Sequence, residues 1–272
     1  MSAPETIPAR IIQTGKSRDL PLLARAAVAN LKCLNPGFEY LFFDDAEVDA
    51  FVQKEYPQYR EVFDHFRFRI QKYDFFRYLA VYHFGGFYFD LDVFLATSLE
   101  RLLSRECVFP FEELTLNRHL RSHHGMDWEM GNYAFGAAPR HPFLKAVIEN
   151  CVKAQRDPQW VLPMLKSVPF FFRSEFQVLN TTGPGLVTRT FAENARLAQG
   201  VTILFPDDVC DPRNWHQFGD FGVHLMHGSW RERGNFLWRR LACLWEARVQ
   251  KQLMVESRKQ GKTRTIPVAQ PQ

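Results

Sequence analysis

The segment 85–93 (GGFYFDLDV) places two carboxylates, Asp90 and Asp92, at the end of a short aromatic run. The run predicts a β-strand, in which side chains i and i+2 share a face, so both carboxylates point the same way and Leu91 points into the core. Two acids on one face repel each other and lose hydration unless a cation compensates. Mg²⁺ and Mn²⁺ take oxygen ligands and bridge carboxylates to phosphate. The pair therefore predicts a metal that holds a phosphate-bearing substrate at the carboxyl end of this strand.

A second charged pair, Asp74 and Arg77, precedes this strand in a segment with a helical pattern. The two residues are i, i+3 neighbours, so they lie on one helix face. A surface ion pair of this kind contributes little to stability. Aromatic residues surround Arg77 in the segment 73–78 (YDFFRY), which favours buried charges directed at a polar group.

The elements that must position these charges alternate along the chain. Strands are predicted at 10–14, 39–43, 106–111, 132–137, 201–205 and 222–227, and helices at 20–34, from Asp44 onward, at 67–84, at 142–155, from 183 and at 235–255. Gly85 and Gly86 end the helix before the acidic strand. Strands alternating with helices predict an α/β fold with a largely parallel sheet.

Composition narrows the class of protein. The chain has 272 residues, of which 46% are hydrophobic, so an ample core is expected. Its five cysteines are scattered with no Cys-x-x-Cys pair, which predicts reduced thiols in a cytosolic protein and neither a disulfide frame nor a zinc site. The first ten residues lack an apolar segment, and no apolar run of about eighteen residues occurs. We therefore expect neither a signal peptide nor a transmembrane helix in this chain.

Basic residues are concentrated near the carboxyl end. The segment from Arg231 to Arg264 contains ten basic and three acidic residues, so its charge is +7. The remainder of the chain carries −3, which gives the net charge of +4. Leucines and Trp245 recur at helical spacing among these arginines, at Leu237, Leu241 and Leu244. Two interpretations stay open: the helix docks on the domain core, or it attaches peripherally to anionic lipid at the cytoplasmic face of a membrane. No stretch resembles a nucleic-acid-binding module, so no nucleic-acid partner is expected.

Several stretches together resemble the signature of the family-32 glycosyltransferases, which contain the Asp-x-Asp sugar-binding region. The family includes fungal α-1,6-mannosyltransferases and inositol-phosphorylceramide mannosyltransferases, and the clostridial glucosylating toxins are more distant relatives. The matching stretches are 71–79 (QKYDFFRYL), 85–92 (GGFYFDLD), 7–14 (IPARIIQT), 182–185 (TGPG), and His224 with 228–230 (GSW).

The resemblance implies a GT-A type nucleotide-sugar-binding fold, α/β in class, with a mixed, mainly parallel central sheet flanked by helices. It implies a catalytic domain over residues 7–232, followed by a basic amphipathic helix over 233–262 and a disordered tail over 263–272. The implied activity is that of a metal-dependent retaining glycosyltransferase, which transfers a hexose from a UDP- or GDP-linked sugar to a glycan or lipid-linked acceptor. Two alternatives stay open: a toxin-like protein glycosyltransferase, and a nucleotide-sugar-binding protein without turnover.

The resemblance also assigns roles to the charged residues. Asp92 would be the principal ligand of Mn²⁺ or Mg²⁺, and Asp90 would contact both the metal and the ribose. Asp74 and Arg77 would grip hydroxyls of the donor sugar, and Tyr88 would line that pocket.

The opening strand would hold the base and ribose of the donor through Ile11, Ile12, Gln13 and Thr14. Ile12 stands where many family members have histidine, which leaves the identity of the base open.

The closing motif would complete the metal site and cover the pyrophosphate. His224 and His227 both lie near Gly-Ser-Trp, and His224 is favoured as the third ligand because its spacing to Gly228 matches the family. Ser229 and Trp230 would close over the pyrophosphate, with core packing as the alternative for Trp230.

Asn132 is a further candidate, as a contact to the sugar or the acceptor from a mid-chain strand. The alternative is that it is a turn residue.

Overall fold

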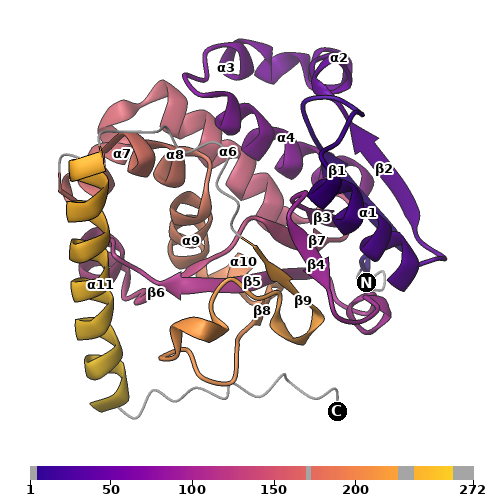
Figure 1. Cartoon of the computed structure of the whole chain (residues 1–272). Helices are drawn as coiled ribbons and strands as arrows, with labels where there is room; N and C mark the ends of the chain where they lie inside the picture. The colour runs from indigo at the N-terminus through magenta and orange to yellow at the C-terminus, as the bar shows by residue number, and fades with distance from the viewer. Residues whose placement is uncertain (1–4, 170–172, 226–235, 260–272) are drawn as a thin grey trace.

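A seven-stranded sheet forms the centre of the molecule in the computed structural model, which describes residues 5–169, 173–225 and 236–259 (Figure 1). The strand order is β2-β1-β3-β7-β5-β6, with β8 also paired to β5. These strands are β1 (Arg10–Thr14), β2 (Glu39–Phe43), β3 (Gly86–Phe89), β5 (Cys107–Leu114), β6 (Trp128–Met130), β7 (Ala134–Ala137) and β8 (Thr202–Leu204). A separate two-stranded sheet pairs β4 (Val93–Leu95) with β9 (Gly222–His224).

The direction of the strands confirms the predicted α/β fold with a mixed, mainly parallel sheet. Strand β1 is parallel to β2 and β3, and β8 is parallel to β5. Strand β7 is antiparallel to both β3 and β5, so β5 runs with β3. Among the described strands of this sheet, β6 and β7 therefore run against the other five.

Helices cover both faces of the sheet. On one face α2 (Asp45–Glu55), α4 (Arg69–Phe84), α6 (Pro142–Arg156) and α9 (Pro184–Glu193) enclose a large apolar cluster with Ile12 and Tyr88. On the other face α1 (Leu22–Leu34) packs with Ile11 and Phe87 in a second cluster. Neighbouring residues of β1 and β3 thus enter opposite cores, as strand alternation requires. The remaining described helices of four or more residues are α3 (Arg60–Asp64), α5 (Arg118–His124), α7 (Pro158–Lys166), α8 (Arg173–Thr181), α10 (Ala195–Ala198) and α11 (Phe236–Lys259).

The turn from α4 into β3 explains the glycine pair that the sequence contains. Gly85 and Gly86 have φ values of 66° and 105°, which L side chains rarely adopt. A Cβ on Gly86 would lie 2.7 Å from the carbonyl oxygen of Arg10, and one on Gly85 would lie 2.7 Å from Cδ of Pro139. Glycine therefore lets the chain pass tightly against β1 and deliver the acidic segment to the sheet.

The predicted strand through Asp92 is wrong in its second half. Strand β3 ends at Phe89, and Asp90 to Asp92 form a turn that the Val93 amide closes by donating to the Asp90 carbonyl at 3.2 Å. Aspartate favours turns, which outweighs the strand pattern of the neighbouring residues. Leu91, expected in the core, is only partly buried and lies beside Gly15. Strand β6 and the helices α3, α5, α7, α8 and α10 are not among the elements predicted from the sequence.

The carboxyl-terminal helix α11 is present as predicted, and one of its faces docks on the domain. Trp245 and Val249 pack against a cluster around Phe176, and Leu253 is buried in a cluster with Phe111. The docking interpretation is thus confirmed for this face, while the predicted tail over 263–272 lies outside the described residues. No helix in the described part of the chain is both long and apolar enough to cross a bilayer.

Candidate metal and donor-sugar site

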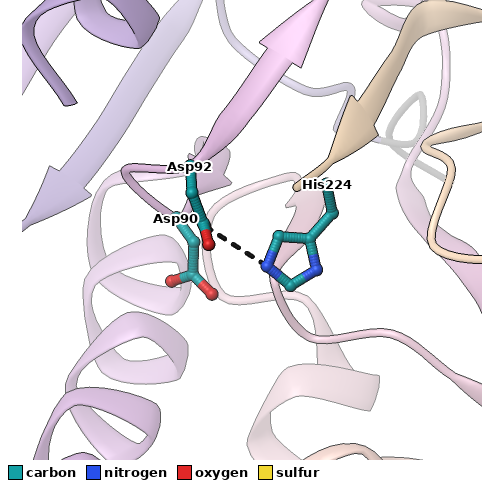
Figure 2. Close-up of side chains that lie close together, drawn as sticks. All are labelled: Asp90, Asp92 and His224. Atoms are coloured by element: carbon teal, nitrogen blue, oxygen red, sulfur yellow. Dashed lines mark ion pairs between the residues drawn. The ribbon is translucent and has the colours of Figure 1, made fainter. Parts of the chain in front are cut away.

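Two short segments, distant in sequence, bring three potential metal ligands together (Figure 2). Asp90 and Asp92 come from the turn between β3 and β4, and His224 comes from the end of β9; one ligand atom from each lies within 4.8 Å of the others. The antiparallel pairing of β4 with β9 sets Val93 opposite His224. The amide of Leu225 also donates to the Asp92 carbonyl at 3.0 Å. His224 therefore depends on strand pairing for its place, and its Nε2 lies 3.2 Å from Oδ1 of Asp92.

The charge and chemistry of these ligands fit a divalent cation. Asp74 and Asp90 both contact the guanidinium of Arg77, and Asp92 pairs with His224. Three carboxylates and one guanidinium leave a formal charge of −2 when His224 is neutral. Two carboxylate oxygens and an imidazole nitrogen are a donor set that suits Mn²⁺ better than Ca²⁺. Asp90, Asp92 and His224 could thus hold such an ion.

Stacking holds the imidazole of His224 in place. Its ring lies 4.3 Å from the ring of Tyr133, with an interplanar angle of 17°. Nδ1 of His224 is buried and has no hydrogen-bond partner among the described residues. Metal-binding histidines usually donate from the second ring nitrogen to a fixed acceptor, and here the stacked tyrosine fixes the orientation of the ring.

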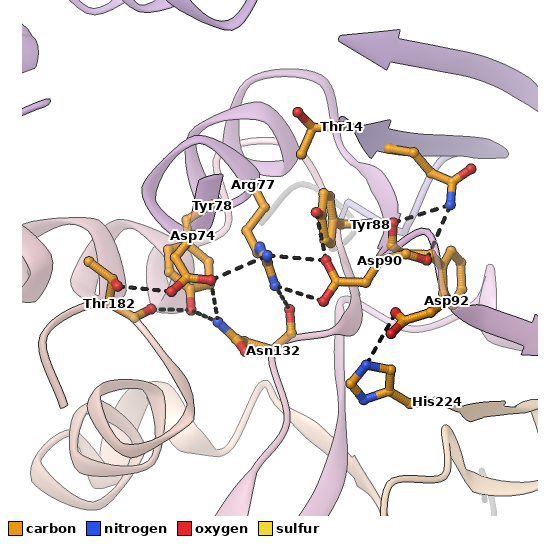
Figure 3. Close-up of polar contacts among 12 residues, drawn as sticks. Thr14, Asp74, Arg77, Tyr78, Tyr88, Asp90, Asp92, Asn132, Thr182 and His224 are labelled. Atoms are coloured by element: carbon orange, nitrogen blue, oxygen red, sulfur yellow. Dashed lines mark hydrogen bonds and ion pairs between the residues drawn. The ribbon is translucent and has the colours of Figure 1, made fainter. Parts of the chain in front are cut away.

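Arg77 is the buried cation beside the three ligands (Figure 3). Its Nη1 donates to the Asn132 carbonyl at 2.7 Å and to Oδ2 of Asp90 at 3.4 Å. Its Nη2 lies 3.1 Å from Oδ1 of Asp90 and 3.3 Å from Oδ1 of Asp74. The guanidinium also sits 4.6 Å from the centre of the Tyr88 ring. Since Arg77 is only 3% exposed, the surface-pair interpretation is excluded and the predicted burial is confirmed.

Asp74 accepts hydrogen bonds from two side chains in addition to its contact with Arg77. Thr182 Oγ1 donates to its Oδ2 at 2.9 Å, and Asn132 Nδ2 donates to its Oδ1 at 3.1 Å. The same Nδ2 donates to the Tyr78 hydroxyl at 2.8 Å, which donates to the Thr182 carbonyl at 2.7 Å. The strand placement of Asn132 is wrong, because the residue lies in a bend before β7. There its side chain cross-links the network, as the turn alternative allowed.

The protonation states follow from burial and from the neighbouring charges. Burial raises the pKa of both Asp74 and Asp90, and Arg77 partly offsets this. Burial disfavours the charged form of Arg77, yet the neighbouring acidic groups, with Asp90 the largest contributor among them, together outweigh burial and raise the pKa of the guanidinium. Burial also raises the pKa of the Tyr88 phenol well above 10. Arg77 is therefore a permanent cation, and Tyr88 is a neutral donor.

Tyr88 and the opening strand β1 support the acidic turn from the buried side of the site. Tyr88 is 1% exposed and donates to Oδ1 of Asp90 at 2.8 Å, so it orients that carboxylate and does not line an open pocket. Ile11 and Ile12 are core residues at 1% and 0% exposure. The buried Gln13 amide donates to the carbonyls of Phe89 and Asp90, at 3.3 Å each. This strand thus supports the acidic turn.

Thr14 ends the opening strand. Its hydroxyl donates to the Phe43 carbonyl at 2.9 Å, and the side chain is 7% exposed. The predicted contact of residues 11–14 with the base and ribose stays a prediction. The side chains of Ile11 and Ile12 are buried and are not accessible for such a contact.

Three predicted residues lie outside the described part of the chain, and three unpredicted ones join the site. His227, Ser229 and Trp230 fall in the segment 226–235, so their roles stay predictions. The network adds Tyr78, Tyr133 and Thr182. Thr182 begins the Thr-Gly-Pro-Gly turn and Tyr78 belongs to the aromatic run around Arg77, whereas no sequence signal marks Tyr133.

Comparison with known proteins finds relatives for part of the chain. Residues 23–109 match the family described as "Glycosyltransferase sugar-binding region containing DXD motif". Mannosyl phosphorylinositol ceramide synthase CSH1 of Saccharomyces cerevisiae is 28% identical over 214 residues, covering 76% of this chain and 50% of that protein. Inositol phosphoceramide mannosyltransferase 1 of Schizosaccharomyces pombe is 31% identical over 153 residues, covering 55% of this chain and 44% of that protein. The chain thus spans about half the length of these curated relatives or less.

Two solved glycosyltransferase structures align with part of the chain. The PaToxG glycosyltransferase aligns with a TM-score of 0.48 and 14% identity over 72% of this chain and 76% of its own. The UDP-bound glycosyltransferase domain from the YGT toxin aligns with a TM-score of 0.49 and 8% identity over 73% and 80%. The match over residues 23–109 agrees with the predicted resemblance to the Asp-x-Asp glycosyltransferases, and the central sheet has the predicted mixed, mainly parallel α/β arrangement with flanking helices.

Proposed function

We propose that this chain, which carries the DXD sugar-binding region of a glycosyltransferase family, is a metal-dependent hexosyltransferase that uses a nucleotide-sugar donor. The observation that supports this best is the convergence of Asp90, Asp92 and His224 directly beside the buried Arg77. A site with excess negative charge and an ordered cation next to it suits a divalent ion and a diphosphate.

We assign different roles in donor binding to different residues of the site. A divalent ion held by Asp90, Asp92 and His224 would neutralise charge on the departing diphosphate. Arg77 and Tyr88 fix the Asp90 carboxylate, whose side chain is 27% exposed while that of Arg77 is 3% exposed. Sugar hydroxyls of the donor would therefore meet this network at Asp90. Such preorganised charge accelerates transfer because no dipole has to reorient as charge develops.

The names of the curated relatives supply a candidate sugar and acceptor. They are called mannosyl phosphorylinositol ceramide synthase and inositol phosphoceramide mannosyltransferase. We therefore propose mannose as the hexose and an inositol-phosphate-bearing sphingolipid as the acceptor, with retention of the anomeric configuration. A covalent nucleophile and same-face attack both remain open as routes to retention, and both UDP and GDP remain open as the nucleotide.

Helix α11 offers a surface that suits a lipid acceptor's membrane. Leu244, Arg248, Lys251 and Val255 are all exposed and recur at i, i+4, i+7 and i+11, so they form one stripe on the helix. This stripe is distinct from the face that buries Leu253. Two cations between two apolar side chains complement an anionic lipid surface. We propose peripheral contact with anionic membrane through this stripe.

Vesicle sedimentation tests the membrane proposal. Lys251→Glu removes one cation and adds one anion, which should weaken binding to phosphatidylserine vesicles by about 2 kcal/mol, or roughly 30-fold. The matched control is Lys54→Glu, because Lys54 is 82% exposed on α2, away from α11 (Figure 1). Equal binding by both variants would contradict contact through α11.

A donor and acceptor screen tests the proposed activity. Purified protein is incubated with UDP- and GDP-hexoses, with and without Mn²⁺, and with inositol phosphoceramide; the released nucleotide and the anomeric configuration of the product are measured. We expect Mn²⁺-dependent transfer, lost at least 100-fold in Asp92→Asn and kept in Asp64→Asn. Asp64 is the matched control because its side chain is exposed and its partner is Arg60, on the same helix α3.

Each outcome separates this proposal from the alternatives. Donor binding without release or transfer indicates a nucleotide-sugar-binding protein. Transfer to protein side chains in place of lipid or glycan indicates a toxin-like enzyme. Full turnover by Asp92→Asn contradicts the metal role of the acidic turn.

A further inference from the structure

The histidine of the proposed metal site is carried by a short hairpin that closes on itself. Residues 216–224 turn back through the Gln217–Val223 bridge, and the amide of His224 donates to the His216 carbonyl at 2.9 Å. Phe218, at 0% exposure, and Phe221, at 7%, anchor the tip of the hairpin in the core. The position of His224 thus depends on where His216 is held.

Glu112 of β5 holds His216 at two points. The amide of His216 donates to the Glu112 carbonyl at 3.1 Å, and Nδ1 of the imidazole lies 3.1 Å from Oε1 of the Glu112 carboxylate. Both side chains are largely buried, at 14% exposure for Glu112 and 15% for His216. β5 belongs to the central sheet, so this contact ties the hairpin to that sheet.

His216 adopts a backbone conformation that needs such support. Its φ is +58°, in the left-handed region, where a residue other than glycine costs about 1–2 kcal/mol. Strain of this kind persists only where the surroundings determine it. The paired backbone and side-chain contacts from Glu112 supply such support, together with the bond from the His224 amide to the His216 carbonyl.

A buried carboxylate at Glu112 would destabilise the fold if packing were its only role. Its Oε2 is buried with no hydrogen-bond partner among the described residues. An incompletely satisfied buried acid costs about 1–3 kcal/mol, and an apolar pair of similar size often stabilises a fold better. The directional contact with His216 is what the carboxylate adds, since it fixes the orientation of the ring and the entry of the hairpin.

We propose that Glu112 is a positioning residue for the metal site. By holding His216 it fixes the hairpin that presents Nε2 of His224 to Asp90 and Asp92. Stacking of Tyr133 on His224 completes the support. The inference rests on the proposed function, because it concerns the ion which that function requires.

Mn²⁺ binding without any nucleotide sugar tests this role. Binding is measured by calorimetry and by the loss of the free-Mn²⁺ paramagnetic resonance signal. Glu112→Ala should weaken Mn²⁺ affinity 10- to 100-fold, the usual effect of removing a residue that orients a metal ligand. Glu112→Gln should stay within about threefold of wild type, because its amide oxygen can accept the same bond from His216. Glu149→Ala is the control, a side chain 50% exposed on α6.

A second variant keeps the test valid if Glu112→Ala does not fold. Asn tolerates the left-handed region, so His216→Asn preserves the backbone of the hairpin while it removes the imidazole. It should weaken Mn²⁺ binding to a similar extent, with the fold checked by circular dichroism.

The outcomes distinguish the two proposals. A wild-type protein that binds no Mn²⁺ overturns both. Wild-type binding that persists unchanged in folded Glu112→Ala and His216→Asn overturns only the positioning role. If Glu112→Gln loses as much affinity as Glu112→Ala, the charge of the carboxylate acts directly on the ion and the positioning role is wrong.

Discussion

Replacing Asn132 by aspartate changes one group in the buried network without changing its shape. Nδ2 of Asn132 donates to Asp74 at 3.1 Å and to Tyr78 at 2.8 Å (Figure 3). Asn132→Asp turns this donor into an acceptor and sets two carboxylates side by side. The charge-assisted bond contributes about 1.5–3 kcal/mol and the neutral bond about 0.5–1.5 kcal/mol. Their loss alone costs about 2–4 kcal/mol.

Repulsion between the two carboxylates makes this cost depend on pH. At pH 8 both are ionised in the unfolded chain, so the folded state must either keep two adjacent charges or take up a proton. The folded variant therefore binds more protons than the unfolded one, and its stability falls as pH rises. We expect a loss of at least about 4 kcal/mol at pH 8 and about half of that at pH 5, where one carboxyl donates to the other.

Urea unfolding at both pH values measures this difference. Asn132→Ala is the matched control, because it loses the same two hydrogen bonds but adds no charge. Its loss should therefore change less between pH 5 and pH 8 than that of Asn132→Asp, because it acts on the pH dependence through the pKa of Asp74, which the Asn132 bond lowers. An Asn132→Asp variant whose loss does not change with pH would refute the contact between Asn132 and Asp74. A variant as stable as wild type would refute the network itself.

Three further predictions concern metal, pH and backbone. Mn²⁺ should raise the melting temperature of wild type, whereas Asp92→Asn should be at least as stable without metal and gain nothing from it, in a thermal-shift assay. Burial raises the pKa of Glu129 from 4.5 to about 7, so the folded state binds a proton that the unfolded chain has lost. The free energy of unfolding should therefore fall by up to about 3 kcal/mol as pH rises from 4.5 to about 7. Glu129→Gln should remove this dependence in urea titrations at pH 5 and pH 8. Gly86→Ala, with φ at +105° and a Cβ 2.7 Å from the Arg10 carbonyl oxygen, should cost at least about 2 kcal/mol by the same method. Gly37→Ala, which meets nothing within 4 Å, should cost less than about 1 kcal/mol.

Local signals in the sequence predicted the elements that carry the first half of the site. The cap of α2 is one example, because Asp44 and Glu47, only three residues apart in the sequence, form reciprocal hydrogen bonds between side chain and backbone. The end of α4 is another, since Gly85 and Gly86 supply the positive φ values that the turn needs. Asp74, Arg77 and the acidic pair all lie on or directly beside these elements, so their proximity followed from local structure.

The second half of the site depends on contacts that no local pattern specifies. His224 meets Asp92 only because β9 pairs with β4, and its role was expected from the family resemblance, not from spacing. Tyr133 stacks on it from another strand end. Glu112 and His216 escaped prediction altogether, because a left-handed histidine and its support by a distant strand leave no mark on the pattern of either segment.

The division of the site into a rigid part and an open part follows from its hydrogen bonds. Asp74 and Arg77, together with Asn132, bond mainly to one another and are at most 7% exposed, so they have little freedom to follow a substrate. The side chains of Asp92 and His224, at 19% and 15% exposed, are the accessible ligands. Buried charges cost stability unless they are paired, and here Arg77 pairs with Asp74 and also fixes the carboxylate of Asp90, which lies between the two parts. The rigid part is therefore best understood as the support of the metal site, and changes there should reduce stability and metal affinity together, whereas changes in the open part should affect metal affinity alone.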